Sequence, residues 1–169
     1  MTQTAQPILG LEAKCYIQSA QGTAITVAAG VVTGGILING LKKITPPKPK
    51  YATEDVTTLG NPDNYRRFMK TLIDGGELAV EGNWMSADPG QVALAAAFSS
   101  APAATYGQNF QFLVLLPPDI VGGQTTTGDS YLYTGPVTDF AMGEEDVDKV
   151  IPFTATIKIS GPPVFTEGV

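Results

Sequence analysis

Few side chains in this sequence are suited to catalysis. The chain has no histidine, which excludes Ser-His-Asp triads and the zinc sites that need imidazole ligands. Its one cysteine, Cys15, belongs to an apolar alternation that predicts a core position, without a general base of the usual kind as partner. No Walker-type phosphate loop or dinucleotide-binding glycine pattern is present. We therefore expect no enzyme activity and no cofactor.

Carboxylates are the remaining groups that could carry chemistry. Glu77 and Glu81 share one face of a predicted strand, but a carboxylate pair without a recognisable pocket is weak evidence for hydrolysis. A second acidic group consists of Glu144, Glu145, Asp146 and Asp148. Its oxygens suit Ca²⁺, yet the spacing differs from that of known Ca²⁺ loops, so we favour a solvated turn and assign no metal site.

The charges are segregated along the chain. The sequence has 10 Lys and Arg against 16 Asp and Glu, and its net charge of -6 argues against nucleic-acid binding through phosphates. Residues 71–148 contain no Lys or Arg, and most basic residues precede them: Lys42, Lys43, Lys48, Lys50, Arg66, Arg67 and Lys70. The two regions are complementary, either within one subunit or between copies that associate head to tail.

Period-two patterns predict the strands that must position these groups. We expect strands over residues 11–18, 36–44, 77–84, 110–116, 131–140 and 151–160. The strand over 110–116 is apolar on both faces, which predicts a central position. Two others contain weak points, at Asn39-Gly40 and at Gly135-Pro136.

One helix is well signalled. Asp88 can cap it, Pro89 suits its first position, and Gln91 stands where a capping-box partner belongs. Residues 92–98 are apolar all round, so we expect a sheet or a neighbouring subunit to cover them. Residues 63–72 form a weaker helical candidate.

Two segments are predicted to be loops. Residues 45–50 contain three prolines and favour an extended polyproline-like path. Together with residues 51–64 they form a long, basic, projecting arm, for which we take the bounds 42–70. Residues 117–129 are rich in Gly and Thr, which predicts a mobile surface loop.

These elements predict the fold class and the domain organisation. We expect one mainly β domain over residues 1–169, a β-sandwich or barrel with one flanking α-helix and a long projecting loop. No apolar run approaches the roughly 18 residues of a membrane span, and no secretory signal is recognisable.

Five motifs follow one another between residues 13 and 98: Glu54-Asp55-Val56-Thr57-Thr58, Arg66-Arg67-Phe68, Asp74-Gly75-Gly76, the strand Leu78–Gly82 and Asp88-Pro89-Gly90-Gln91. Their order resembles the major tail tube proteins of long-tailed, siphovirus-type bacteriophages, such as the tube domain of the phage lambda major tail protein. The last three predicted strands resemble the family only in general pattern.

The resemblance implies a virion structural protein. Six copies would pair strands edge to edge into a ring, and stacked rings would form the tube through which DNA is ejected without specific binding. The implied partners are further copies of the chain, the tape-measure protein and the tail-tip and terminator proteins, with no membrane. The protein would be made in the host cytoplasm and reside in the virion tail. The immunoglobulin-like domain of the lambda relative is expected to be absent, because the chain ends at Val169.

The resemblance also suggests residue roles. The arm would reach the neighbouring subunit and the adjacent ring through Lys42, Lys43, Lys48, Lys50, Arg66 and Arg67, with Asp74 or the acidic group at 144–148 as partners. Pairing of Arg66 and Arg67 within one subunit is an equal alternative. Gly75-Gly76 would supply positive φ, and Trp84 would anchor the core. Acidic walls repel phosphate, so Glu77 and Glu81 are the candidates for the lumen.

Two other function classes stay open. One is the tube of a type VI secretion-like contractile system, which shares the general architecture. The other is a monomeric β-sandwich that binds carbohydrate or Ca²⁺, which should show exposed aromatic residues at a loop tip or a defined ligand cage.

Overall fold

Two antiparallel sheets and a projecting hairpin make up the fold. The computed structural model describes residues 12–20, 22–28, 30–58, 65–100, 109–120, 123–144 and 150–169. One sheet has five strands in the order β13 (Val164–Thr166), β10 (Ser130–Gly135), β9 (Phe110–Leu115), β1 (Lys14–Gln18) and β4 (Gly35–Ile38). The other has four, in the order β11 (Val137–Met142), β12 (Pro152–Lys158), β8 (Glu77–Asn83) and β5 (Leu41–Thr45).

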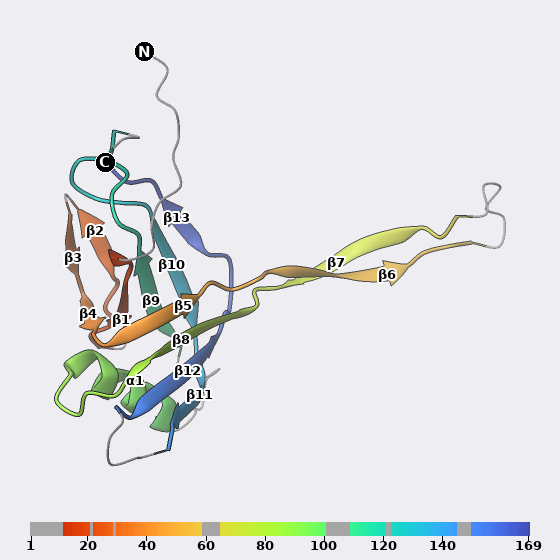
Figure 1. The fold of residues 1–169 in the computed structure, drawn as a ribbon. Helices are drawn as coiled ribbons and strands as arrows, with labels where there is room; N and C mark the ends of the chain where they lie inside the picture. Colours follow the sequence, from red (N-terminus) through yellow and green to blue (C-terminus); the bar gives the residue numbers. More distant parts are fainter. Residues whose placement is uncertain are drawn as a thin grey trace.

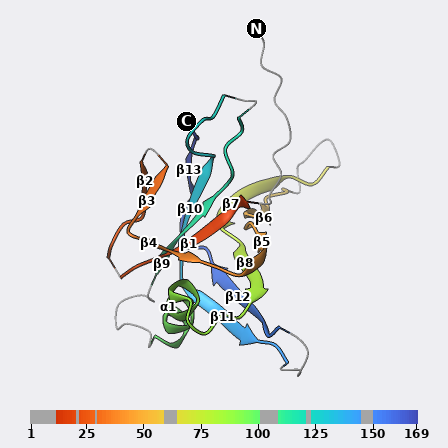
Figure 2. The ribbon, with the colours of Figure 1, turned by 60° about the vertical axis from the view of Figure 1, so that its left-hand side comes forward.

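Two further hairpins and one helix complete the described elements. A short hairpin pairs β2 (Thr26–Ala28) with β3 (Val31–Thr33). A longer one pairs β6 (Lys50–Asp55) with β7 (Phe68–Asp74) and projects far from the sheets (Figure 1). The helix α1 (Pro89–Ser99) packs beside β11 and β4 (Figure 2). Among the described residues, no helix is long and apolar enough to cross a membrane.

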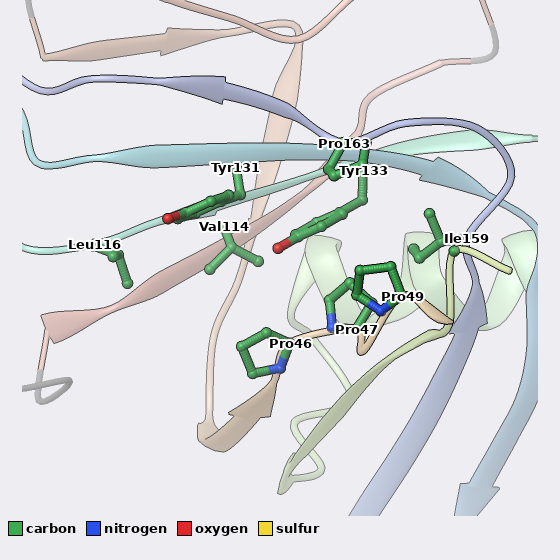
Figure 3. A pocket seen from close by; sticks show the side chains of 10 residues that line it. Pro46, Pro47, Pro49, Val114, Leu116, Tyr131, Tyr133, Ile159 and Pro163 are labelled. Atoms are coloured by element: carbon green, nitrogen blue, oxygen red, sulfur yellow. The ribbon is translucent and has the colours of Figure 1, made fainter. Parts of the chain in front are cut away.

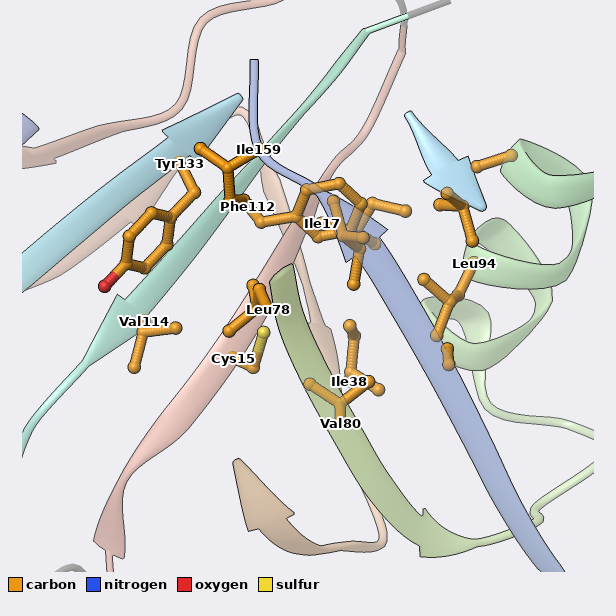
Figure 4. Close-up of a cluster of buried hydrophobic side chains, with 14 of the residues drawn as sticks. Cys15, Ile17, Ile38, Leu78, Val80, Leu94, Phe112, Val114, Tyr133 and Ile159 are labelled. Carbon is orange, nitrogen blue, oxygen red and sulfur yellow. The ribbon is translucent and has the colours of Figure 1, made fainter. Parts of the chain in front are cut away.

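Alternating side chains of both sheets form the core, as Figure 4 shows. Buried and solvent-facing positions alternate along β8 and β12, which confirms both predicted strands. β9 lies in the middle of the five-stranded sheet, as its two apolar faces predicted. Cys15 is fully buried among these side chains, and this burial raises the pKa of its thiol to about 12.

The predicted strands over 36–44 and 131–140 are each two strands in different sheets. The chain leaves β4 at Asn39-Gly40 and enters β5, and it leaves β10 at Gly135-Pro136 and enters β11. Gly40 has a φ of 74°, and a Cβ there would lie 2.7 Å from the carbonyl oxygen of Asn83. The predicted weak points are therefore the places where the chain crosses from one sheet to the other.

The predicted helix is confirmed, and Asp88 caps it as expected. The Asp88 carboxylate accepts a hydrogen bond from the Gln91 backbone amide at 2.9 Å, and Pro89 opens the first turn. The side chain of Gln91 does not complete a capping box, because it binds other backbone groups. Leu94 and Ala97 are buried, whereas Val92 and Phe98 are exposed, so the subunit covers only part of the apolar helix.

The helix predicted over 63–72 is wrong. Residues 68–74 form β7, which pairs with β6, and residues 59–64 lie outside the part of the chain that is described. The arm is therefore mainly a β-hairpin, although residues 46–49 form an irregular link as predicted. Lys42 and Lys43 precede the arm, because they belong to β5 in the four-stranded sheet.

Residues 117–120 and 123–129 lie in a loop, as predicted. The side chain of Gln124 holds its two ends together. It accepts a hydrogen bond from the Asp119 amide at 2.8 Å and donates one to the Asp129 carboxylate at 2.6 Å. These bonds give the loop a defined path.

Candidate functional site: a projecting hairpin and a polar sheet face

The β6–β7 hairpin continues a strand pair of the four-stranded sheet. β5 pairs with β8, and the same two chain segments pair again as β6 and β7 beyond the links at 46–49 and 75–76. The result is one long ribbon whose outer half leaves the body of the protein (Figures 1 and 2). Every residue of β6 and β7 is exposed.

The hairpin carries large apolar side chains that the described part of the subunit leaves about half or more exposed. Each of the following is at least 48% exposed: Tyr51, Phe68, Met69, Leu72 and Ile73. Isolated two-stranded hairpins are marginally stable in water, and such a concentration of exposed apolar side chains marks an interaction site. The hairpin is therefore a candidate surface for association.

Close backbone packing fixes the root of the hairpin. Gly76 has a φ of 78°, and a Cβ there would lie 2.8 Å from the backbone nitrogen of Lys48. Gly75 has no positive φ, but a Cβ there would lie 2.9 Å from the Ile159 carbonyl oxygen. The predicted positive φ is thus confirmed for Gly76 only, and Gly75 serves close approach.

Lys158 gathers two carboxylates beside this root. Its Nζ lies 3.0 Å from Asp74 Oδ1 and 3.7 Å from Glu77 Oε1. Hydrogen bonds from the Gly76 amide and from Lys158 lower the pKa of Asp74. The hydrogen bond to Asp74 in turn raises the pKa of Lys158, with further support from Glu77. Asp74, which was predicted to contact another copy, thus has a cationic partner within its own subunit.

A second ion pair lies farther along the same sheet. Lys43 Nζ donates to Glu81 Oε1 at 2.8 Å, and the two side chains are 62% and 43% exposed. Water screens such pairs, so each contributes little to stability. Their consequence is local: both candidate lumen carboxylates face a lysine of the same chain.

One face of the four-stranded sheet carries charged side chains together with small ones. Leu78, Val80 and Gly82 of β8 point into the core, so the alternate residues and their cross-strand partners point away from it. We call this surface the polar face: Lys43, Thr45, Glu77, Ala79, Glu81, Asn83, Asp139, Ala141, Pro152, Thr154, Thr156 and Lys158. It holds two cations and three carboxylates, a net charge of one negative unit.

The polar face ends on both sides in an edge strand. β5 and β11 are the outer strands of the sheet, and within the described residues neither has a partner on its outer side. Both edges carry a break in register, at Leu41/Lys43 and at Val137/Asp139. Open edges invite pairing with another chain, and bulges restrict which partner fits.

The other predicted contact residues are spread over the ribbon. Lys48 lies in the link and Lys50 at the start of β6, whereas Arg66 and Arg67 lie next to the far end of β7. Glu144 is exposed, and residues 145–148 lie outside the described ranges. Contacts of these residues between copies stay predictions.

Trp84 lies where a core anchor was predicted, and Lys158 has a role that was not predicted. Trp84 is half-buried at the edge of the core and packs edge-on against Phe140 and Phe153, with ring centroids 5.8 and 6.2 Å away. The ion pairs of Lys158 with Asp74 and Glu77 were not predicted. Its period-two relation to Thr154 and Thr156 would have placed it on the polar face.

Comparisons with known proteins identify the fold. No protein-family model matches the chain, and no curated protein matches it. A chain in the cryo-EM structure of the anti-feeding prophage baseplate superposes with a TM-score of 0.66 and 9% identity, over 97% of this chain and 98% of that one. A chain of the PVC sheath–tube complex, an extracellular contractile injection system, gives 0.63 and 9%, over 95% and 92%.

A chain of the SPP1 tail tube gives a TM-score of 0.60 and 13% identity, over 96% of this chain and 80% of that one. At such identities the similarity establishes the fold alone. The protein thus has the mainly β fold found in tail tubes and in related contractile assemblies, which confirms the predicted fold class. A specific relation to the lambda-like tubes of siphoviruses is not among these findings.

Proposed function

We propose that the protein is a structural subunit of a tail tube. Copies join side by side into rings, with six copies as the expected number, and the rings stack into a conduit for DNA ejection. The observation that carries the proposal is a sheet with a polar face that is open at both edges, β5 and β11, within a tail tube fold.

Pairing of β11 of one copy with β5 of the next would leave no unpaired edge strand in the four-stranded sheets of a ring. When β11 of one copy meets β5 of the next, the interface is heterologous, and repeated rotation can close it. The four-stranded sheets then become one continuous barrel without edges, the arrangement that most fully prevents non-specific strand pairing. The polar face would line either the bore or the outside of that barrel.

We assign the polar face to the bore because its chemistry suits a conduit. Basic walls would bind DNA phosphates by releasing counterions. Here Lys43 pairs with Glu81, and Lys158 pairs with Asp74 and Glu77. Among the residues of the polar face itself, Asp139 leaves one negative charge in excess. The remaining side chains are mostly Thr and Ala, which offer a passing polyanion no strong contact. Glu77 and Glu81 stay our candidates for the lumen.

Assembly is tested with the full-length chain. We expect the concentrated protein, alone or with its tail-tip and tape-measure proteins, to form hollow tubes of uniform diameter in negative-stain electron microscopy. Amide hydrogen exchange should slow on assembly in β5 and β11, whereas β9, already central in its sheet, serves as the internal control. A protein that stays monomeric with both partners present would refute the tube function.

The bore assignment has its own test. Reversal of Glu77 and Glu81 to lysine should leave tubes intact but slow DNA ejection, because four lysines would then face the phosphates. Exchange of Lys43 and Glu81 keeps the charge of the polar face and serves as the matched control. Normal ejection through tubes that carry the reversal would remove both residues from the bore.

A contractile injection system is the second candidate. The similarity to chains of the anti-feeding prophage and PVC assemblies favours it, with TM-scores at least as high as that of the SPP1 tail tube. A type VI secretion-like tube is one form of this candidate. Co-purification with a sheath protein encoded nearby would favour it, whereas capsid and tape-measure genes alone would favour a long-tailed phage.

A further inference from the structure

An apolar groove lies at the root of the hairpin, between the link at 46–49 and the five-stranded sheet. Three adjoining hollows form it, of about 370, 470 and 620 Å³. The central hollow is lined by Pro46, Pro47 and Pro49 on one side and by Val114, Tyr131 and Tyr133 on the other (Figure 3). The two tyrosine rings stack with their centroids 6.3 Å apart and an interplanar angle of 10°. This size and lining are typical of sites that receive large apolar side chains.

The two ends of the groove differ in charge. Lys42 and Lys43 lie at the end beside β5, and Asp74 lies at the end beside the hairpin root. Lys43 and Asp74 already have ion-pair partners, Glu81 and Lys158. The side chain of Lys42 has no partner within the described residues. In sequence, the groove thus has the Lys42 ammonium at one end, an apolar centre, and at the other end a carboxylate that already binds Lys158.

One face of the hairpin has the complementary pattern. Three successive cross-strand pairs share this face: Tyr51 with Ile73, Thr53 with Lys70, and Asp55 with Phe68. Lys70 Nζ lies 5.0 Å from the centre of the Tyr51 ring, which agrees with this placement. Near the far end, the exposed Phe68 stands opposite Asp55, whose carboxylate accepts hydrogen bonds from the amide and hydroxyl of Thr57. Lys70 is the next residue of β7 on the same face. The opposite face carries Met69, paired with Glu54.

The hairpin of the same subunit cannot fill this groove. The groove is built from residues at the root of the hairpin, among them Pro46, Pro49 and Gly75. Asp74 lies at the root end of β7, and the hairpin projects outward from it (Figure 1). Phe68, six residues earlier in the same strand, therefore lies roughly 20 Å farther out. A second copy of the chain carries the same ribbon and can present its far end to the groove.

We propose that the groove receives the hairpin of a neighbouring copy, with Phe68 inserted between the prolines and the tyrosines. Asp55 then meets Lys42, and Lys70 approaches Asp74. This inference rests on the proposed self-assembly and adds a receptor for the hairpin. Because each copy holds both the hairpin and the groove, the contact is heterologous, and the same contact can repeat from one copy to the next.

Cross-linking between copies tests the contact. We would introduce Phe68→Cys together with Leu116→Cys, whose side chain lines the central hollow. The matched control combines Met69→Cys with Leu116→Cys, because Met69 is similarly exposed, 54% against 61%, but lies on the opposite face. Cys15 is fully buried and should not react. Oxidation, or a short bis-maleimide, should yield a ladder of covalent oligomers from the Phe68 variant and far fewer from the control.

Alanine variants give a second measurement. Phe68→Ala should raise the protein concentration needed for assembly at least about tenfold, as expected for a central apolar anchor, whereas Met69→Ala should leave it nearly unchanged. Tubes that form normally without a ladder, or with equal ladders from both pairs, would overturn the groove contact while leaving the tube function intact. A chain that never assembles would overturn both.

Discussion

Replacement of Gln91 by leucine should destabilise the protein far more than its small change in volume suggests. The Gln91 side chain is fully buried at the start of α1. Its Nε2 donates to the carbonyl oxygens of Asn39 and Asn83 at 2.7 and 2.9 Å, and its Oε1 accepts from the Met85 amide at 2.7 Å. One side chain thus ties together the crossing from β4 to β5, the end of β8 and the helix.

The magnitude follows from the three backbone groups that would lose their partner. Each unsatisfied group costs about 1–3 kcal/mol when buried, and these groups are only partly buried, so we use the lower end. The sum is about 3 kcal/mol, a large share of a typical unfolding free energy of about 5–15 kcal/mol. With a urea m-value of about 1–3 kcal/mol/M, the midpoint should fall by about 1–3 M.

Urea unfolding followed by fluorescence of Trp84, the one tryptophan, measures this effect. Trp84 directly precedes Met85 and packs against two core aromatic rings, so its emission reports on the same region. Val92→Ala is the matched control, because Val92 is the next residue of the helix but is exposed. A midpoint for Gln91→Leu within about 0.3 M of the wild type would refute the reasoning, since it would leave no room for three lost hydrogen bonds.

Three further predictions concern the hairpin root and the core. Gly76→Ala should cost at least about 1–2 kcal/mol in urea unfolding, because a Cβ at a φ of 78° is strained and would crowd the Lys48 backbone; an unchanged midpoint would contradict this packing. The Cys15 thiol, whose pKa is raised to about 12 by burial, should resist a thiol reagent at pH 8 in the folded protein and react once urea unfolds it; rapid labelling of the native state would contradict its burial. The Asp74–Lys158 pair should add a small stability only between two pH limits. Because the pKa of Asp74 is lowered in the folded protein, the stability that its carboxylate contributes is lost as the pH falls through this pKa. Because the pKa of Lys158 is raised, the stability that its ammonium contributes is lost as the pH rises through this second pKa. Titration of the Asp74 carboxyl by NMR, with Lys158→Met as control, should show a pKa below the ordinary range that moves up in the variant.

Local sequence patterns were sufficient to predict the elements that depend only on neighbouring residues. The cap at Asp88 and the alternation in β8 and β12 each depend on side chains within one element, so the sequence predicted them. The crossings at Asn39-Gly40 and Gly135-Pro136 could be marked but not interpreted. An alternation that runs through a turn looks the same whether the second half stays in the sheet or enters another.

Residues 63–72 show the opposite case, in which tertiary pairing overrides a local signal. Arginine, methionine, lysine and leucine in this stretch favour a helix, but β7 gains a full antiparallel partner in β6. The ion pair between Asp74 and Lys158 joins residues 84 positions apart, so only the register of β8 with β12 brings them together. Sequence alone therefore indicated which charges exist but not which of them neutralise one another.

If the protein forms the proposed tube, the placement of these ion pairs meets two conflicting demands. A subunit needs charge on its surface to stay soluble before assembly, yet unpaired lysines in a bore would retain DNA. On the polar face each lysine contacts a carboxylate of its own chain, so both lysines are paired within the subunit before any ring forms. The β6–β7 hairpin, which projects away from the sheets, carries five of the exposed apolar side chains. In the proposed tube, burial of these hairpin side chains would stabilise the assembly, whereas the lysines that line the bore would already be paired within each subunit.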